Sequence, residues 1–96
     1  MATYSVHTVK SASLSTTVVD TLNFDGGNSV TVVNPGSTAI SFTVGVGGGT
    51  AATPTALGDD MFYCPATGAV TLDHFAEPVT QVKLIGSGNA YSVTVI

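Results

Sequence analysis

The sequence has little charge. Its 96 residues include two Lys or Arg and six Asp or Glu, so 8% are charged and the formal net charge is −4. About a quarter of the residues are charged in a typical globular domain. Binding a phosphate backbone requires clustered basic residues, and Lys10 and Lys83 lie far apart in the sequence. The composition therefore excludes nucleic acid as a partner.

Other features are missing as well. The sequence has no Trp, a single cysteine (Cys64), and no apolar run of the roughly 20 residues that a membrane-spanning helix needs. Residues 1–10 lack the apolar stretch of a signal peptide. One cysteine cannot form an internal disulfide, which is typical of a reducing compartment. We therefore expect a protein without a membrane partner that is made and folds in a cytoplasm.

What is present is a pattern of strands. Ile40, Phe42 and Val44 alternate with Ser41 and Thr43, and such a period of two is typical of half-buried strands. The same alternation recurs over residues 91–95. We expect strands at 3–9, 16–22, 29–33, 39–44, 61–64, 69–72, 80–85 and 91–95, separated by Gly-, Pro- and Asn-containing turns at 25–28, 34–37 and 86–89.

These strands predict an all-β fold and a single domain over residues 1–96. The expected architecture is a small antiparallel β-sandwich, Ig-like or jelly-roll-like, of about seven or eight strands. Residues 1–13 are expected to form either an extended N-terminal arm or an edge strand.

A glycine-rich loop follows the strand at 39–44, with glycines at positions 45, 47, 48 and 49. A phosphate-binding loop also needs a following helix and a Lys. Here Pro54 and several threonines follow, and the next Lys is Lys83. We therefore reject phosphate binding and expect residues 46–59 to be a long, flexible connection that rests on another protein.

No group of residues predicts catalysis or a cofactor. His7 and His74 are the only histidines, and no G-x-S-x-G motif occurs. Cys64 could pair with His74, but a buried structural cysteine is the preferred interpretation. The candidate metal ligands fit neither calcium nor zinc spacing; they are Asp59, Asp60, Asp73, His74 and Glu77. We expect a protein that is not an enzyme and has no cofactor or metal.

Two aromatic residues are candidates for exposure. Phe62 lies in a short strand in which Met61 and Tyr63 face the opposite side, and Phe75 lies in a connection. Burial in the core is nevertheless the preferred interpretation for each.

Several segments together resemble small virion proteins of tailed bacteriophages. They are residues 32–34, the strand at 39–44, the glycine- and threonine-rich loop, FYCPA at 62–66, VKLIGSG at 82–88 and YSVTV at 91–95. The resemblance covers about residues 29–96. It implies a structural protein on the capsid surface of a virion, made in the host cytoplasm, that binds the major capsid protein. It also implies a homo-oligomer, with a trimer as one option.

The expected contacts come from the uncharged N-terminal segment, the loop and the two candidate aromatics. The named residues are Tyr4, Val6, Val46, Gly47, Gly48, Gly49, Phe62 and Phe75. A phage tail or tail-tip β module and a carbohydrate-binding module are the alternative functions. The missing Trp counts against the carbohydrate-binding module.

Overall fold

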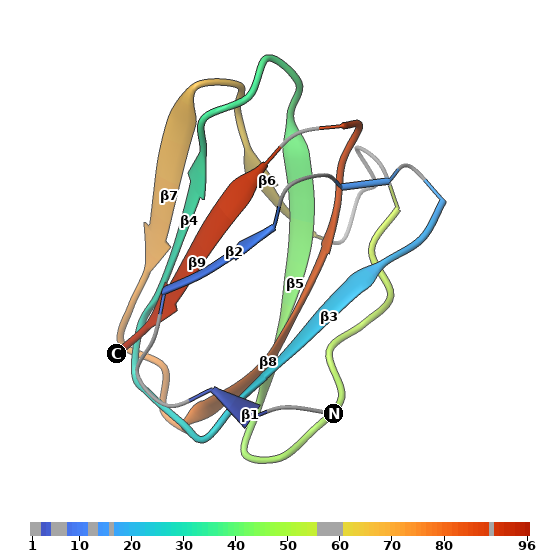
Figure 1. Ribbon diagram of the computed structural model, residues 1–96. Coiled ribbons are helices and arrows are strands. Elements are labelled where there is room, and N and C mark those ends of the chain that lie inside the picture. Colours follow the sequence, from blue (N-terminus) through green and yellow to red (C-terminus); the bar gives the residue numbers. More distant parts are fainter. Residues whose placement is uncertain (1–2, 5–7, 12–13, 16, 56–60, 89) are drawn as a thin grey trace.

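The computed structural model describes residues 3–4, 8–11, 14–15, 17–55, 61–88 and 90–96, and these ranges form two stacked β-sheets (Figure 1). No helix occurs within them. Their nine strands are β1 (Thr3–Tyr4), β2 (Thr8–Ser11), β3 (Asp20–Phe24), β4 (Val30–Asn34), β5 (Ile40–Val46), β6 (Phe62–Cys64), β7 (Gly68–Leu72), β8 (Val79–Ile85) and β9 (Tyr91–Val95). The predicted all-β sandwich is confirmed.

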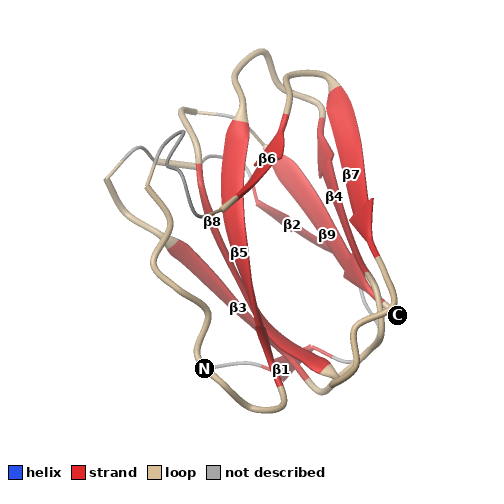
Figure 2. Cartoon of the chain, turned by 180° about the vertical axis from the view of Figure 1, so that it is seen from behind, coloured by secondary structure: helices blue, strands red, loops and turns tan. Residues whose placement is uncertain are grey.

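The strand order follows a nested pattern. One sheet has the order β1-β3-β8-β5-β6 and the other β2-β9-β4-β7. The pairs β5–β6, β4–β7, β3–β8 and β2–β9 are all antiparallel. They are the successive layers of one long hairpin that has been rolled up so that alternate layers enter opposite sheets (Figure 2). This is the topology of a jelly roll, so it settles the choice between the two predicted architectures.

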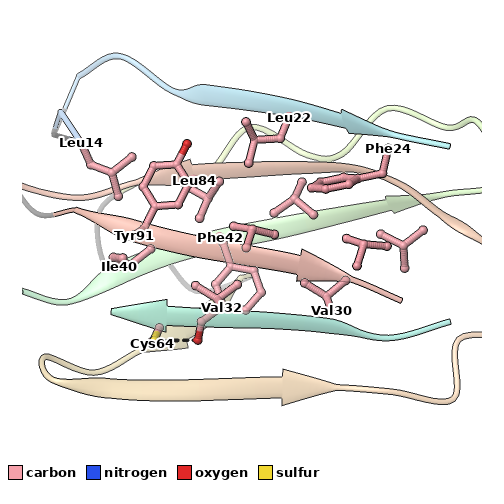
Figure 3. Close-up of a cluster of buried hydrophobic side chains, with 14 residues drawn as sticks. Leu14, Leu22, Phe24, Val30, Val32, Ile40, Phe42, Cys64, Leu84 and Tyr91 are labelled. Atoms are coloured by element: carbon pink, nitrogen blue, oxygen red, sulfur yellow. Dashed lines mark hydrogen bonds between the residues drawn. The ribbon is translucent and has the colours of Figure 1, made fainter. Parts of the chain in front are cut away.

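The core lies between the sheets and is built from the apolar positions of the alternating strands. In β9, Tyr91, Val93 and Val95 are buried while Ser92 and Thr94 are half-exposed. Ile40 and Phe42 of β5 are fully buried. Leu14, Leu22 and Leu84 pack into the same cluster from the other strands and from the segment before β3 (Figure 3). Period-two patterning therefore placed β5 and β9 correctly.

Two predicted strands were wrong in their bounds. The strand expected at 16–22 begins only at Asp20, because the hydroxyl of Ser15 accepts hydrogen bonds from the N–H groups of Thr17 (3.0 Å) and Val18 (3.1 Å) and holds a turn there. The strand expected at 3–9 is divided in two. Its first part, β1, pairs parallel to β3, whereas β2 pairs antiparallel to β9 in the other sheet.

Candidate binding surface

Two aromatic side chains of β6 are exposed at one side of the sandwich. β6 pairs with the first half of β5, so that Phe62 lies opposite Phe42 and Cys64 opposite Ile40. Phe62 leans on buried Phe42 with ring centroids 5.4 Å apart, yet it remains 42% exposed. Tyr63 points to the opposite face of the sheet and is 52% exposed. The two side chains leave β6 on opposite faces of this edge strand, and we take the strand as the candidate binding surface because aromatic side chains are frequent anchors at protein interfaces.

Beside this pair, Asn34 holds together the loops at the end of the sandwich where β6 stops. Its side chain is fully buried and donates hydrogen bonds to the carbonyls of Thr38 (2.7 Å) and Pro65 (3.2 Å). Its carbonyl oxygen accepts the N–H of Gly36 at 3.0 Å. The turn after β4 and the turn after β6 are thereby fixed to each other.

Further hydrogen bonds connect the remaining loops at this end. The N–H of Thr67 donates to the carbonyl of Gly36 (3.0 Å), and the hydroxyl of Thr38 donates to the main-chain carbonyl of Ser87 (3.0 Å). The N–H of Gly88 donates to the carbonyl of Leu14 at 2.7 Å. We call residues 14–15, 34–39, 65–67 and 86–88 the neutral end, since none of them is ionisable. It is the upper end in Figure 1.

The opposite end carries most of the described acidic residues. The loops 25–29 and 73–78 and the turn 47–49 lie there, and we call them the acidic end. Asp25, Asp73 and Glu77 are all exposed. His74 is also exposed and lies 3.6 Å from Asp73. Three of the four described acidic side chains therefore lie at this end, whereas Asp20 lies near the neutral end, where its carboxylate accepts a hydrogen bond from the Tyr91 hydroxyl (3.1 Å).

The glycine-rich turn cannot cradle an anion, which agrees with the rejection of phosphate binding. The N–H of Gly47 donates to the carbonyl of Pro78 (2.8 Å), and that of Gly48 donates to the hydroxyl of Thr80 (2.9 Å). The N–H of Gly49 donates to the carbonyl of Val46 (2.8 Å). All three amides already have partners within the fold, whereas a phosphate loop keeps its amides available.

After the turn, the chain folds back over its own sheet. Ala51 and Pro54 are buried against the outer face of β5 and β8. The N–H of Ala51 donates to the side chain of Gln81 (2.9 Å), and the hydroxyl of Thr43 donates to the carbonyl of Ala52. We call residues 50–55 the strap. The loop that was expected to rest on another protein therefore rests, up to residue 55, on the protein's own sheet, and residues 56–60 lie outside the described ranges.

Cys64 and His74 are not brought together. Cys64 is fully buried, and its thiol lies 3.6 Å from the carbonyl of Val32 (Figure 3). The carbonyl of Gly68 lies at the same distance. Burial raises the pKa of the Cys64 thiol, and a backbone hydrogen bond with Asn34 acts in the opposite direction. His74 is exposed at the acidic end. The described ranges contain no cluster of three metal-ligating side chains, and Asp59 and Asp60 fall outside them.

The predicted contact residues do not form one surface. Phe62 is the exposed aromatic near the neutral end. Gly47, Gly48 and Gly49 are exposed at the acidic end, where Val46 and Phe75 are half-buried against the core. Tyr4 lies in β1 opposite Phe24, at the same end, and Val6 lies outside the described ranges.

Sequence reasoning did not select Tyr63 or Val33. Tyr63 was expected to face away from Phe62, and this alternation was the signal that could have identified it. Val33 is 39% exposed on the outer face of β4, although the run of valines in this strand suggests burial throughout. Val33 falls between Val32 and Asn34, which both face the core, and this alternation was the available signal.

None of the described segments forms a helix of the length and hydropathy needed to cross a membrane.

No protein family and no curated protein matches the sequence. Among solved structures, PliG of Aeromonas hydrophila, a periplasmic lysozyme inhibitor of g-type lysozyme, is similar with a TM-score of 0.52 and 16% identity over 98% of this chain and 96% of that chain. CsCBM6-3 from Clostridium stercorarium, in complex with cellobiose, has a TM-score of 0.38 and 23% identity over 80% of this chain and 65% of that chain. The likeness to PliG concerns the fold alone.

Proposed function

We propose that this chain is a structural virion protein of a tailed bacteriophage that binds the outside of the capsid and stabilises contacts between major capsid protein subunits. The observation that supports this proposal is the exposed pair Phe62 and Tyr63 beside the neutral end. The protein acts by binding and carries out no chemistry.

The neutral end suits a permanent protein contact for two reasons. Burying an unpaired charge is expensive, and these loops contain none. Their hydrogen bonds fix the loops before a partner arrives, so that less conformational entropy is lost on binding. Tyr63 adds the kind of aromatic anchor that dominates binding energies at protein interfaces.

Binding to a capsid would explain why this protein can have a surface with so few charged residues. A surface poor in charge gives little protection against self-association, and this matters less when neighbouring subunits cover it. A protein that binds only the assembled shell stabilises the shell by mass action. The resemblance of residues 29–96 to small virion proteins supports the same role.

The test is the number of copies per particle in the phage that encodes this chain. Quantitative mass spectrometry of purified particles should give a simple ratio to the major capsid protein. The variant Tyr63→Ser should fall well below wild-type occupancy, because it removes an exposed anchor without touching the core. We choose Tyr63 over Phe62 because Phe62 also packs on Phe42, and its loss would change stability.

The matched control is Ile96→Ser, which removes a 67% exposed apolar side chain at the other end of the sandwich and should leave occupancy unchanged. Equal occupancy of Tyr63→Ser and wild type would reject this surface. A handful of copies per particle would reject the capsid role in favour of a tail module. Absence from particles would reject both virion roles, and a glycan-binding screen would then test the carbohydrate-binding alternative.

A further inference from the structure

The four edge strands of the described sandwich are not equally protected against pairing with another chain. Natural proteins protect edges by making them short or by placing Lys, Pro or bulges on them. β1 has two residues, β6 has three, and β2 contains Lys10. β7 has five residues, GAVTL, with no charge and no Pro, and its register with β4 is unbroken. β7 is therefore the long, unprotected edge of the part of the chain that the structure describes.

The hydrogen-bonding direction of β7 follows from its neighbours. Ser29 and Ile96 exchange two hydrogen bonds of 3.1 Å, so alternate residues from Ser29 onward direct their N–H and C=O groups toward β9. The intervening residues of β4, among them Val32, are directed toward β7. Val32 lies opposite Val70, which leaves the main-chain groups of Ala69 and Thr71 directed outward.

These outward groups are open to a partner. Within the described ranges, neither Ala69 nor Thr71 makes a main-chain hydrogen bond outside the sheet. Both residues are exposed. Together they present two N–H donors and two C=O acceptors along one straight edge.

A second β7 satisfies all four groups in a single register. If two β7 strands run antiparallel about a twofold axis at Val70, Ala69 of each lies opposite Thr71 of the other. Each of these two residue pairs then exchanges two hydrogen bonds. Val70 faces its own copy across the axis, where its half-buried side chain gains apolar cover. No other register about β7 uses all the outward groups.

The charges next to β7 favour this antiparallel arrangement. Asp73 follows the strand directly. In the antiparallel register it lies beside uncharged Thr67 of the second copy. The two Asp73 carboxylates are then roughly 20 Å apart at about 3.4 Å per residue, which is well beyond the screening length of about 8 Å in physiological salt. A parallel arrangement would place the two carboxylates side by side.

We propose that this protein forms a twofold dimer in which β7 pairs antiparallel with β7 of a second copy. The two four-stranded sheets join into one continuous sheet across the axis. Each copy uses its β7 edge completely, so the contact closes on itself and leads to a dimer without further growth.

The first test compares two substitutions at Ala69 by sedimentation velocity across a concentration series. Ala69→Pro removes an outward N–H and leaves every bond to β4 in place, so we expect loss of the dimer with the circular dichroism spectrum retained. Ala69→Ser keeps the N–H and should dimerise like the wild type. A wild-type protein that stays monomeric at its highest soluble concentration would overturn the proposal, as would an undiminished Ala69→Pro dimer.

A second test does not depend on how well a proline variant folds. Residues that face each other without mutual hydrogen bonds have Cα atoms about 4.5 Å apart, which is within disulfide range. Val70→Cys should therefore form a disulfide-linked dimer under mild oxidation. Ala69→Cys is the control, because position 69 is more exposed but lies opposite position 71. If the Ala69→Cys variant cross-linked more than the Val70→Cys variant, as the exposure of the two positions alone would predict, the proposed register would be wrong.

Both tests use the isolated protein and do not rest on the proposed capsid role. A monomer in solution that still occupies particles would reject the dimer alone. A dimer that is absent from particles would reject the virion function alone.

Discussion

At the scale of single residues, Cys64 is a fully buried thiol. The thiol lies at the end of β6, and the carbonyls near it belong to β4 and β7. Because ionisation there would place a negative charge away from water, burial raises the pKa of this thiol. The side chain behaves as a small apolar residue with a weak donor.

This environment predicts a loss of stability at alkaline pH. With its pKa raised in the folded protein, Cys64 releases its proton more readily when the chain is unfolded, so the free energy of unfolding should fall as pH rises above about 8.5. Urea titrations across this pH range should show the fall in the wild type. Cys64→Ala should be less stable overall but show a flatter dependence on pH. A wild-type curve parallel to that of the variant would contradict the assignment.

The sequence predicted the role of some residues but not of others, because some roles depend on contacts between distant segments. The burial of Cys64 followed from its place at the end of a predicted strand, where a cysteine is usually a small buried apolar residue, and this prediction is confirmed. The role of Asn34 did not follow, because a turn signal shows where the chain reverses but not which distant carbonyls the side chain will reach. Two of its acceptors lie some 30 residues away in sequence.

At the scale of elements, the strap depends on one glycine. A Cβ atom at Gly45 would lie 2.5 Å from the carbonyl oxygen of Gly49 and 2.8 Å from the amide nitrogen of Ala51. Only a residue without a side chain allows the strap to lie flat on β5. The strap in turn covers Thr43, which would otherwise face solvent on the outer side of the sheet.

We therefore expect Gly45→Ala to displace the strap. The overpacking should cost about 1–3 kcal/mol of unfolding free energy, measured by thermal or urea denaturation. Amide hydrogen exchange should increase at residues 50–55. The control is Gly48→Asn, since a Cβ there meets nothing within 4 Å and Asn tolerates the positive φ of 84°. Equal losses in the two variants would show that the strap does not depend on close packing at Gly45.

The elements differ in how well the sequence predicted them. β9 alternates strictly, so its period was sufficient. The alternating sequence also located β5, although Ser41 and Thr43 are buried too and the strand continues to Val46. β3 was placed too early because Val18 and Val19 look like strand residues, whereas the side chain of Ser15 holds a turn just before them. The strap has no periodic signal, since its burial arises from an approach to a sheet that only the folded chain creates.

At the scale of the whole molecule, the separation of charge predicts how the proposed capsid contact responds to salt. Binding through charged groups weakens as salt screens them. The loops of the neutral end have no ionisable residue, the nearby carboxylate of Asp20 is partly buried and hydrogen-bonded to Tyr91, and the exposed acids lie at the opposite end. Occupancy on particles should therefore change by less than roughly twofold between low and high salt. Release of the protein by moderate salt would instead place the contact at the acidic end.

The rolled hairpin also sets an order of events during synthesis. The innermost pair, β5–β6, closes the shortest stretch of chain, and each completed pair brings the next two strands closer together. β2 differs from the inner strands, because its neighbour in the sheet is β9, the ninth of the described strands in chain order. A strand that emerges early must therefore stay unpaired until nearly all of the domain has been translated. We expect the four-stranded sheet to be the slowest part of the fold to form and the part most exposed to chaperones on a ribosome.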